Sequence, residues 1–164
     1  MFEIRVAGQS DLATIHEMIV ALAEYERLAH LCVTTQADLA DALFGSHPAA
    51  EVLIAEENGQ AAGFALFFHN FSTFLGRRGL WLEDLFVLPV FRRRGCAKAL
   101  LRALAAIAVQ RGCGRFEWAV LDWNEQAIHF YESLGAKLLP EWRITRIIEP
   151  ELSRLALESL PDRS

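Results

Sequence analysis

A short basic loop that joins a strand to a long helix constrains this chain more than any other feature. Residues 80–88 predict a strand that Pro89 ends, and three consecutive arginines, 92–94, follow it. From Gly95 to Gln110, small and apolar residues recur every three or four positions, which predicts an amphipathic helix. Because the first N–H groups of a helix lack partners within it and attract anions, the loop favours phosphate binding.

The loop matches neither of two common phosphate-binding motifs. A Walker loop requires Gly-Lys-Ser/Thr, which does not follow Gly95. A dinucleotide fingerprint requires more glycines, and here the strand before the loop belongs to an antiparallel meander. Taken alone, the loop could also be an ordinary solvated helix start.

The remaining pattern predicts a single domain of mixed α/β structure over residues 1–164. The expected strands are residues 2–7, 52–56, 62–69, 80–88, 116–121 and 142–148. The expected helices are residues 12–28, 36–44, 95–110, 124–133 and a short one from Pro150. Asn58-Gly59 predicts a tight hairpin turn. The order is therefore a strand, two helices, three antiparallel strands, a helix, a strand, a helix and a strand, with the short helix last. The third strand of the meander thus begins a strand–helix–strand unit.

Composition excludes several classes of function. A net charge of -5 disfavours nucleic-acid binding, which depends on Lys and Arg at phosphates. No apolar run approaches the roughly 20 residues that span a bilayer. The first residues lack a signal-peptide pattern, so we expect a cytoplasmic protein. Three widely spaced cysteines predict neither a disulfide framework nor a metal site.

Arg92–Ala97 fits the Arg/Gln-x-x-Gly-x-Gly/Ala loop, and the whole chain resembles the GCN5-related N-acetyltransferase (GNAT) superfamily. Further runs resemble the spermidine/spermine (diamine) acetyltransferases, including their thialysine-acetylating branch. These runs are Leu22–Glu26, Phe44–Pro48, Leu82–Val87, Trp123–Glu125 and Phe130–Tyr131. The resemblance implies the GNAT fold, a mostly antiparallel mixed sheet flanked by helices, with acetyl-CoA (coenzyme A) as the acyl donor.

The resemblance also implies roles for individual residues. Tyr131 matches the family's catalytic tyrosine, and Glu83 matches its proposed base, which acts through water. The positions implied to bind the cofactor are Leu85, Phe86, Val87, Arg92, Arg93, Arg94, Gly95, Cys96, Ala97, Lys98, Asn124, Glu125, Gln126, Ala127 and Tyr131. The positions near the amine are Tyr25, Glu26, Glu83 and Asp84, and Glu141 could be a further contact.

These residue types suit amine acetylation. A free alkyl amine has a pKa near ~10, so it arrives protonated and must lose a proton before it attacks a thioester. Glu83 can accept that proton, Asp84 can hold the cation, and a backbone N–H near Leu85 can stabilise the carbonyl oxygen. The Tyr131 hydroxyl can protonate the leaving thiolate. Since adjacent strand residues face opposite sides, we predict a β-bulge near Glu83 to Leu85.

The sequence departs from the polyamine enzymes at two acidic positions. Residues 27–31 contain no carboxylate, and Ser72-Thr73 stands where those enzymes have another acid. This departure favours the thialysine branch, whose acceptors are amino acids with a side-chain amine. Such an acceptor also carries a carboxylate, and the candidate cations for it are Arg27, Arg77, Arg78 and Arg143.

Two alternatives remain for the function. The acceptor could be a peptide amine or an aminoglycoside instead of a small amine. The chain could also be a regulator that binds acyl-CoA without turnover, although such a protein would not need both Glu83 and Tyr131. A homodimer is expected, because family members are commonly dimers and the C-terminal segments are apolar.

Overall fold

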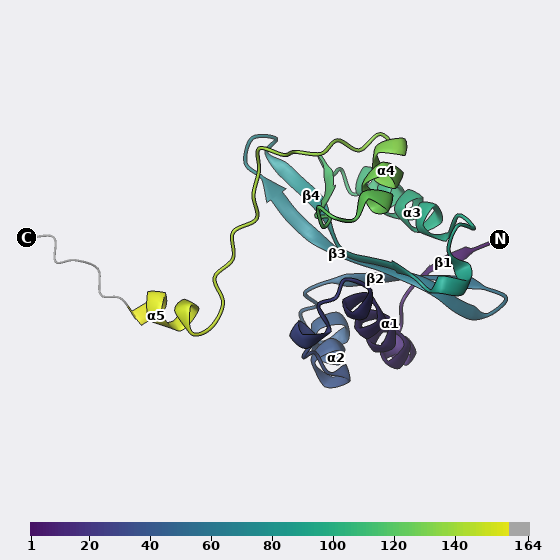
Figure 1. Ribbon diagram of the computed structural model, residues 1–164, viewed down its shortest axis with the longest axis horizontal. Coiled ribbons are helices and arrows are strands. Elements are labelled where there is room, and N and C mark those ends of the chain that lie inside the picture. Colours follow the sequence, from purple (N-terminus) through teal and green to yellow (C-terminus); the bar gives the residue numbers. More distant parts are fainter. Residues whose placement is uncertain (158–164) are drawn as a thin grey trace, which may run out of the picture. The chain divides into compact units, whose positions relative to one another are not determined.

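The computed structural model describes residues 1–157, and its contacts divide the chain into two compact units, Met1–Ala119 and Val120–Ser164. The first unit holds a five-stranded sheet in the order β1-β2-β3-β4-β5 (Figure 1). The strands are β1 Glu3–Val6, β2 Glu51–Glu57, β3 Gln60–Ser72, β4 Arg77–Val87 and β5 Phe116–Trp118. The first four pair antiparallel, and β5 pairs parallel to β4. The predicted mixed α/β class, mostly antiparallel, is confirmed.

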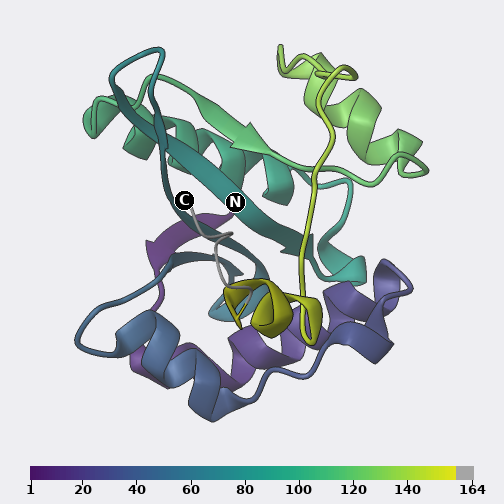
Figure 2. The same ribbon diagram turned by 90° about the vertical axis from the view of Figure 1, so that its left-hand side faces the viewer.

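Three helices of the first unit cover the two faces of the sheet. They are α1 Leu12–Tyr25, α2 Gln36–Phe44 and α3 Cys96–Gln110. α1 and α2 lie along one face and α3 along the other, as both ribbon views show (Figures 1 and 2). The second unit contains α4 Glu125–Ser133 and α5 Glu151–Leu157. None of the helices in residues 1–157 is long and apolar enough to cross a membrane.

The sheet is buried on both faces, which explains the apolar runs in its central strands. Ile54 and Phe64 pack with Ile15 and Met18 of α1 in one core cluster. Leu53, the neighbour of Ile54, is also buried. Because side chains alternate along a strand, neighbours that are both buried indicate a covered sheet on each side.

Local signals place the turns and helix ends. Asn58 and Gly59 both adopt left-handed backbone angles (φ 53° and 74°), as a two-residue type I′ hairpin requires, so the predicted turn is confirmed. The Thr35 hydroxyl accepts from the Asp38 N–H, and the Asp38 carboxylate accepts from the Thr35 N–H. This capping box sets the start of α2.

The predicted strand at residues 142–148 is wrong. In the structure this segment has no strand hydrogen bonding, and Trp142 and Ile144 are 75% and 70% exposed. An alternating pattern supplies two different faces but not a hydrogen-bonding partner, and a strand exists only with a partner. Two other elements are shorter than predicted, since α1 ends at Tyr25 and β5 ends at Trp118.

Candidate active site

The predicted irregularity in β4 is a β-bulge at Glu83. Leu82 lies opposite Phe67 and Asp84 lies opposite Leu66, which leaves Glu83 with no opposing residue on β3. The prediction of a bulge near Glu83 is therefore confirmed. A bulge turns the strand locally, so that two consecutive residues can serve one site.

Three carboxylates, which we call the acidic corner, come together where β4 bulges beside the end of α1. They are Glu26, Glu83 and Asp84. Burial, together with the negative charges of Glu83 and Glu26, raises the pKa of Asp84 to about 6. Burial also raises the pKa of Glu26. No Lys, Arg or His within residues 1–157 forms an ion pair with any of the three.

A hydrogen bond from Trp81 orients the exposed carboxylate of the acidic corner. The indole Nε1 of Trp81 donates to Oε2 of Glu83 over 2.8 Å. Sequence reasoning missed this contact, although residues two apart on a strand share one face. The bond leaves the other oxygen of Glu83 available to a ligand or a water molecule.

The edge of β4 beyond the bulge has no strand partner in the first unit. β5 pairs only with Leu80–Leu82, whereas Leu85, Phe86 and Val87 pair with β3 on their other side. An unpaired edge offers N–H and C=O groups to another extended chain. This edge therefore fits the implied role of these three residues, which is to hold the pantetheine arm of the donor like an added strand.

α1 ends in a Schellman motif that fixes the direction of Tyr25 and Glu26. The Leu28 N–H donates to the Ala23 carbonyl oxygen (2.8 Å), and the Arg27 N–H donates to the Glu24 carbonyl oxygen (3.0 Å). Arg27 is left-handed, with φ 63°, at the position that glycine usually occupies. The helix consequently stops directly beside the acidic corner.

Arg92 contacts the ends of both α1 and β4. Its Nε donates to the carbonyl oxygen of Val87 over 2.9 Å. Its guanidinium carbon lies 4.8 Å from the ring centroid of Tyr25 and 5.4 Å from that of Phe86. The sequence predicted a cofactor contact for Arg92. The aromatic contacts were not predicted, because they depend on how the loop turns back over the ends of α1 and β4.

The loop before α3 has a conformation suited to an anion. Arg93 and Gly95 both adopt left-handed angles (φ 58° and 88°), and no side chain caps the first N–H groups of α3. Arg94 pairs with Glu57 at 2.5 Å, whereas no residue within 1–157 pairs with Arg93. The uncapped helix start and the unpaired arginine fit the phosphates of a coenzyme A group.

The loop residues that follow differ in how they could contact a ligand. Cys96 is only 1% exposed, and burial, with a smaller contribution from Glu57, raises its thiol pKa to about 11. The thiol is therefore protonated at neutral pH and is not a nucleophile. Ala97 is half-buried and Lys98 is exposed at the start of α3. Only the backbone of Cys96 is suited to the predicted cofactor contact.

The predicted residues of the second unit lie on and beside α4. Asn124 is the N-cap of α4, and its Oδ1 accepts from the Ala127 N–H over 3.2 Å. Glu125 and Gln126 form the first turn of the helix. The geometry of the second unit alone does not test the cofactor contacts implied for residues 124–127, so these contacts stay predictions.

Tyr131 lies near the end of α4 and is half-buried. Its ring is tilted against that of Phe130, with centroids 5.4 Å apart. Glu141 is exposed in a turn of the same unit. The catalytic role of Tyr131 and the amine contact of Glu141 stay predictions for the same reason.

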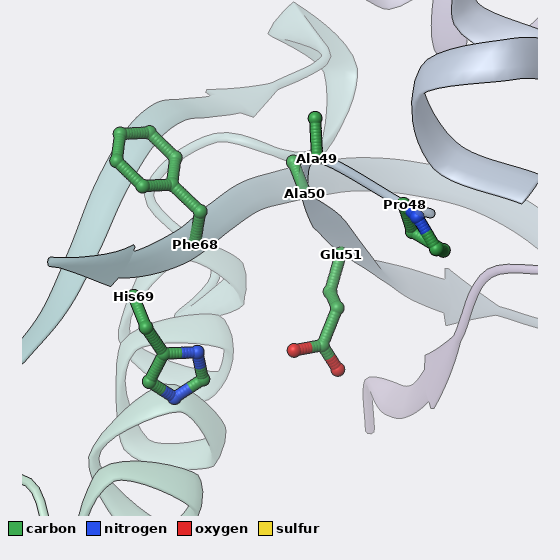
Figure 3. Close-up of a pocket in the computed structure, with 6 residues that line it drawn as sticks. All are labelled: Pro48, Ala49, Ala50, Glu51, Phe68 and His69. Atoms are coloured by element: carbon green, nitrogen blue, oxygen red, sulfur yellow. The ribbon is translucent and has the colours of Figure 1, made fainter. Parts of the chain in front are cut away.

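A separate cavity of about 290 Å³ lies between the start of β2 and the end of β3 (Figure 3). Its lining residues are Pro48, Ala49, Ala50, Glu51, Phe68 and His69. Glu51 accepts two hydrogen bonds from Arg111, and burial lowers the pKa of His69. No residue of the predicted site lines this cavity, so the acidic corner and the cavity are separate features of the first unit.

Comparison with known proteins identifies the family. Residues 15–136 match the acetyltransferase (GNAT) family. L-ornithine N5-acetyltransferase NATA1 of Arabidopsis thaliana is 35% identical over 189 residues, which cover 88% of this chain and 83% of that protein. Thialysine N-epsilon-acetyltransferase of Mus musculus is 36% identical over 146 residues, which cover 84% of this chain and 85% of that protein.

The solved structures agree with these relatives. An integron cassette protein from the mobile metagenome of V. cholerae superposes with a TM-score of 0.80 at 27% identity, covering 96% of this chain and 98% of that one. The family and the fold that the loop and the ordered runs implied are thereby confirmed. This chain belongs to the acetyltransferase (GNAT) family and is an N-acetyltransferase.

Proposed function

We propose that this enzyme transfers an acetyl group from acetyl-CoA directly to the side-chain amine of a small amino acid, within a ternary complex. The observation that carries the proposal is the acidic corner. Three carboxylates share one partly buried place, and within residues 1–157 none of them has an ion-pair partner. A cationic acceptor would relieve the repulsion among them, and perturbed carboxylates of this kind mark functional sites.

The donor side of the proposal rests on the loop and the open edge of β4. Arg93 and the uncapped N–H groups of α3 would hold the phosphates of acetyl-CoA. Leu85, Phe86 and Val87 would hold its pantetheine arm through their backbone. When bound, acetyl-CoA supplies the acyl group as an activated thioester.

The residues of this chain would then move the protons. The acidic corner accepts one proton from the acceptor ammonium, with Glu83 or Asp84 as the nearest carboxylates. As the new C–N bond forms and the C–S bond breaks, a backbone N–H near Leu85 stabilises the carbonyl oxygen. The Tyr131 hydroxyl gives a proton to the leaving thiolate, and the second proton that the acceptor nitrogen loses returns to the Tyr131 oxygen. The proton taken up by the acidic corner leaves to solvent, so charge and protons balance.

The choice of an amino-acid acceptor draws on the relatives, whose names specify L-ornithine and thialysine. Ser72 supports it less than the sequence suggested. Its side chain is 4% exposed, and its hydroxyl accepts from the Leu75 N–H in the hairpin turn. Leu66 marks the position of the bulge on β3, because it lies opposite Asp84. Ser72 is six residues farther along β3, so it lies roughly 20 Å from the bulge.

Among the cations proposed for the acceptor carboxylate, Arg27 is the best placed. It follows Glu26 directly at the end of α1. Arg77 and Arg78 lie at the hairpin end of β4, roughly 17 to 20 Å from the bulge, which is farther than a lysine-like side chain of four carbons reaches. Arg143 belongs to the second unit.

We also propose that the enzyme is a cytoplasmic homodimer. Large apolar side chains of the second unit are exposed, and exposed apolar surface of this size favours association. They are Leu138, Leu139, Trp142, Ile144, Ile147, Ile148, Leu152 and Leu155. The three cysteines are free, as is usual in a reducing compartment. Light scattering during size-exclusion chromatography would give twice 18.4 kDa for a dimer and would contradict it at 18.4 kDa.

Thiol release from acetyl-CoA, measured against a panel of amines, tests the proposed function. The panel contains ornithine, thialysine, lysine, putrescine, spermidine and a lysine-containing peptide. We expect turnover with amino acids that carry a side-chain amine and little with spermidine. Preference for spermidine would contradict the acceptor class, and acetyl-CoA binding without turnover on any amine would contradict the enzymatic proposal.

A further inference from the structure

The end of α1 carries acceptor-side residues but has little buried surface to hold it. Leu22 is the last buried residue of the helix, and Tyr25 is 40% exposed. The backbone then turns through the left-handed Arg27, which is exposed. A helix end with few buried contacts is a place where proteins open locally. The Schellman motif shapes the backbone of this end, but it makes no contact that holds Glu26 against β4.

Arg92 supplies a contact of the required kind. It comes from the loop after β4, and it reaches back to the carbonyl oxygen of Val87, the last residue of that strand. The same guanidinium lies over the rings of Tyr25 on α1 and Phe86 on β4. Phe86 is only 4% exposed, so this side of the contact is anchored in the core. One planar cation thus joins the end of the helix to the end of the strand.

The three consecutive arginines differ in their contacts. Arg94 pairs with Glu57 and Arg92 contacts Tyr25, Phe86 and Val87. Within residues 1–157, Arg93 has no ion pair, hydrogen bond or ring contact, and its left-handed backbone presents it at the start of α3. An anion at this loop therefore meets Arg93 without competing partners, whereas Arg92 already contacts other residues.

We propose that Arg92 is a positioning residue for the acceptor: it holds Tyr25 and Glu26 beside the end of β4, while Arg93 meets the phosphates of the donor. This division of labour rests on the proposed function of the acidic corner and the loop. It assigns two neighbouring arginines of one motif to two different substrates. Loss of Arg92 affects acceptor binding, and loss of Arg93 affects donor binding.

Two matched variants, Arg92→Gln and Arg93→Gln, test the division. Each removes one charge from the same loop. For the amine that the wild-type enzyme turns over best, we expect Arg92→Gln to raise the acceptor KM about tenfold, equivalent to about 1.4 kcal/mol, with the acetyl-CoA Kd within about twofold of wild type. Arg93→Gln should do the reverse. A weaker acetyl-CoA Kd in Arg92→Gln with an unchanged acceptor KM would overturn the proposal.

A double-mutant cycle with Tyr25→Leu tests the contact itself. If Arg92 acts through Tyr25, the double variant should have nearly the acceptor KM of Arg92→Gln alone. If the two substitutions acted independently, the increases in acceptor KM would multiply in the double variant. That result would contradict the proposal that Arg92 acts through Tyr25. Arg92→Lys should recover part of the affinity, because an ammonium can still lie over the ring.

Hydrogen exchange gives a readout that does not depend on turnover. Amides of residues 25–31 should exchange faster in Arg92→Gln than in the wild type, with no change in Arg93→Gln and none in the buried strand β2. Unchanged exchange in Arg92→Gln would overturn the positioning role. The amine panel with the wild-type enzyme tests the proposed function separately. Failure of the positioning role of Arg92 can therefore be distinguished from failure of the proposed function.

Discussion

Glu51 on β2 and Asp84 on β4 are partly buried carboxylates of one sheet, and their pKa values move in opposite directions. Arg111 donates two hydrogen bonds to Glu51, at 2.5 and 2.8 Å, and lowers the pKa of Glu51 despite its burial. Burial, together with the negative charges of Glu83 and Glu26, raises the pKa of Asp84 to about 6. Glu51 has its counter-ion within the protein, whereas Asp84 is suited to a cation that arrives from solution.

The two carboxylates therefore have different physical consequences. A paired carboxylate contributes modestly to stability, since the ion pair is partly exposed. Like charges held together without a cation reduce stability, and proteins retain such arrangements mainly at functional sites. If this interpretation is right, replacing Asp84 should damage activity and improve stability, and replacing Glu51 should do neither.

The largest expected effect is on activity, and it should differ between Asp84 and Glu51. Asp84→Asn should lower kcat/KM for the acceptor by about 100-fold or more, because it removes a negative charge from cation binding and proton transfer. Glu51→Gln, the matched control, should stay within about twofold of wild type, since it lies at the separate cavity. Steady-state thiol-release kinetics measure both, and equal losses in the two variants would break the comparison.

Tyr131→Phe tests whether the acidic corner acts without help from the second unit. We expect kcat to fall by about 10- to 100-fold, the lower part of the range for general acids, with the acetyl-CoA Kd unchanged. The phenyl ring keeps the packing against Phe130 and removes only the hydroxyl. Turnover equal to that of the wild type would remove Tyr131 from the mechanism.

The stability of Asp84→Asn should depend on pH in a defined direction. The folded-state pKa of about 6 lies above the ordinary value of 3.8, so the folded protein binds the proton more tightly than the unfolded chain. Wild-type stability therefore falls as pH rises from about 4 to about 6. At pH 7 Asp84→Asn should be more stable by about 3 kcal/mol, and most of the gain should be lost near pH 4.

Urea denaturation of the wild type and of Asp84→Asn across this pH range measures the difference. Glu83 and Glu26 share the titration, so the midpoint belongs to the acidic corner as a group. A variant that is less stable than the wild type at pH 7 would show that Asp84 has a structural partner.

The smallest expected effect concerns Glu51→Gln, and its sign is opposite. Arg111 lowers the folded-state pKa of Glu51, so the contribution to stability is present above its ordinary pKa and is lost as pH falls. Because the pair is partly exposed, we expect a loss of about 0.5 kcal/mol at pH 7. High salt should reduce that loss, and a gain in stability would contradict this interpretation of Glu51.

Much of the fold could be predicted because its signals are local. The hairpin at Asn58-Gly59, the start of α2 and the amphipathic helix α3 depend on residues near each other in sequence. The bulge at Glu83 was also predictable, since two adjacent carboxylates can serve one site only if the alternation of the strand is interrupted.

Other features were not predictable because they depend on where the fold places the partner of a strand or a side chain. Residues 142–148 alternate like a strand, yet the structure gives them no strand partner. Trp81 and Glu83 were both visible in the sequence, but their hydrogen bond depends on the local geometry of the bulge.

The residue pattern was enough to assign the family, to locate the basic loop before α3 and to name the types of residue available for amine acetylation. The fold determines which carboxylate lacks an ion pair within residues 1–157 and which arginine packs against aromatic rings. Arg111 contacts Glu51, and Arg92 contacts Tyr25, yet the two residues of each pair lie far apart in the sequence. Charge and hydrogen bonding act over a few ångströms in space, so a side chain's pKa and role depend on what the fold packs against it.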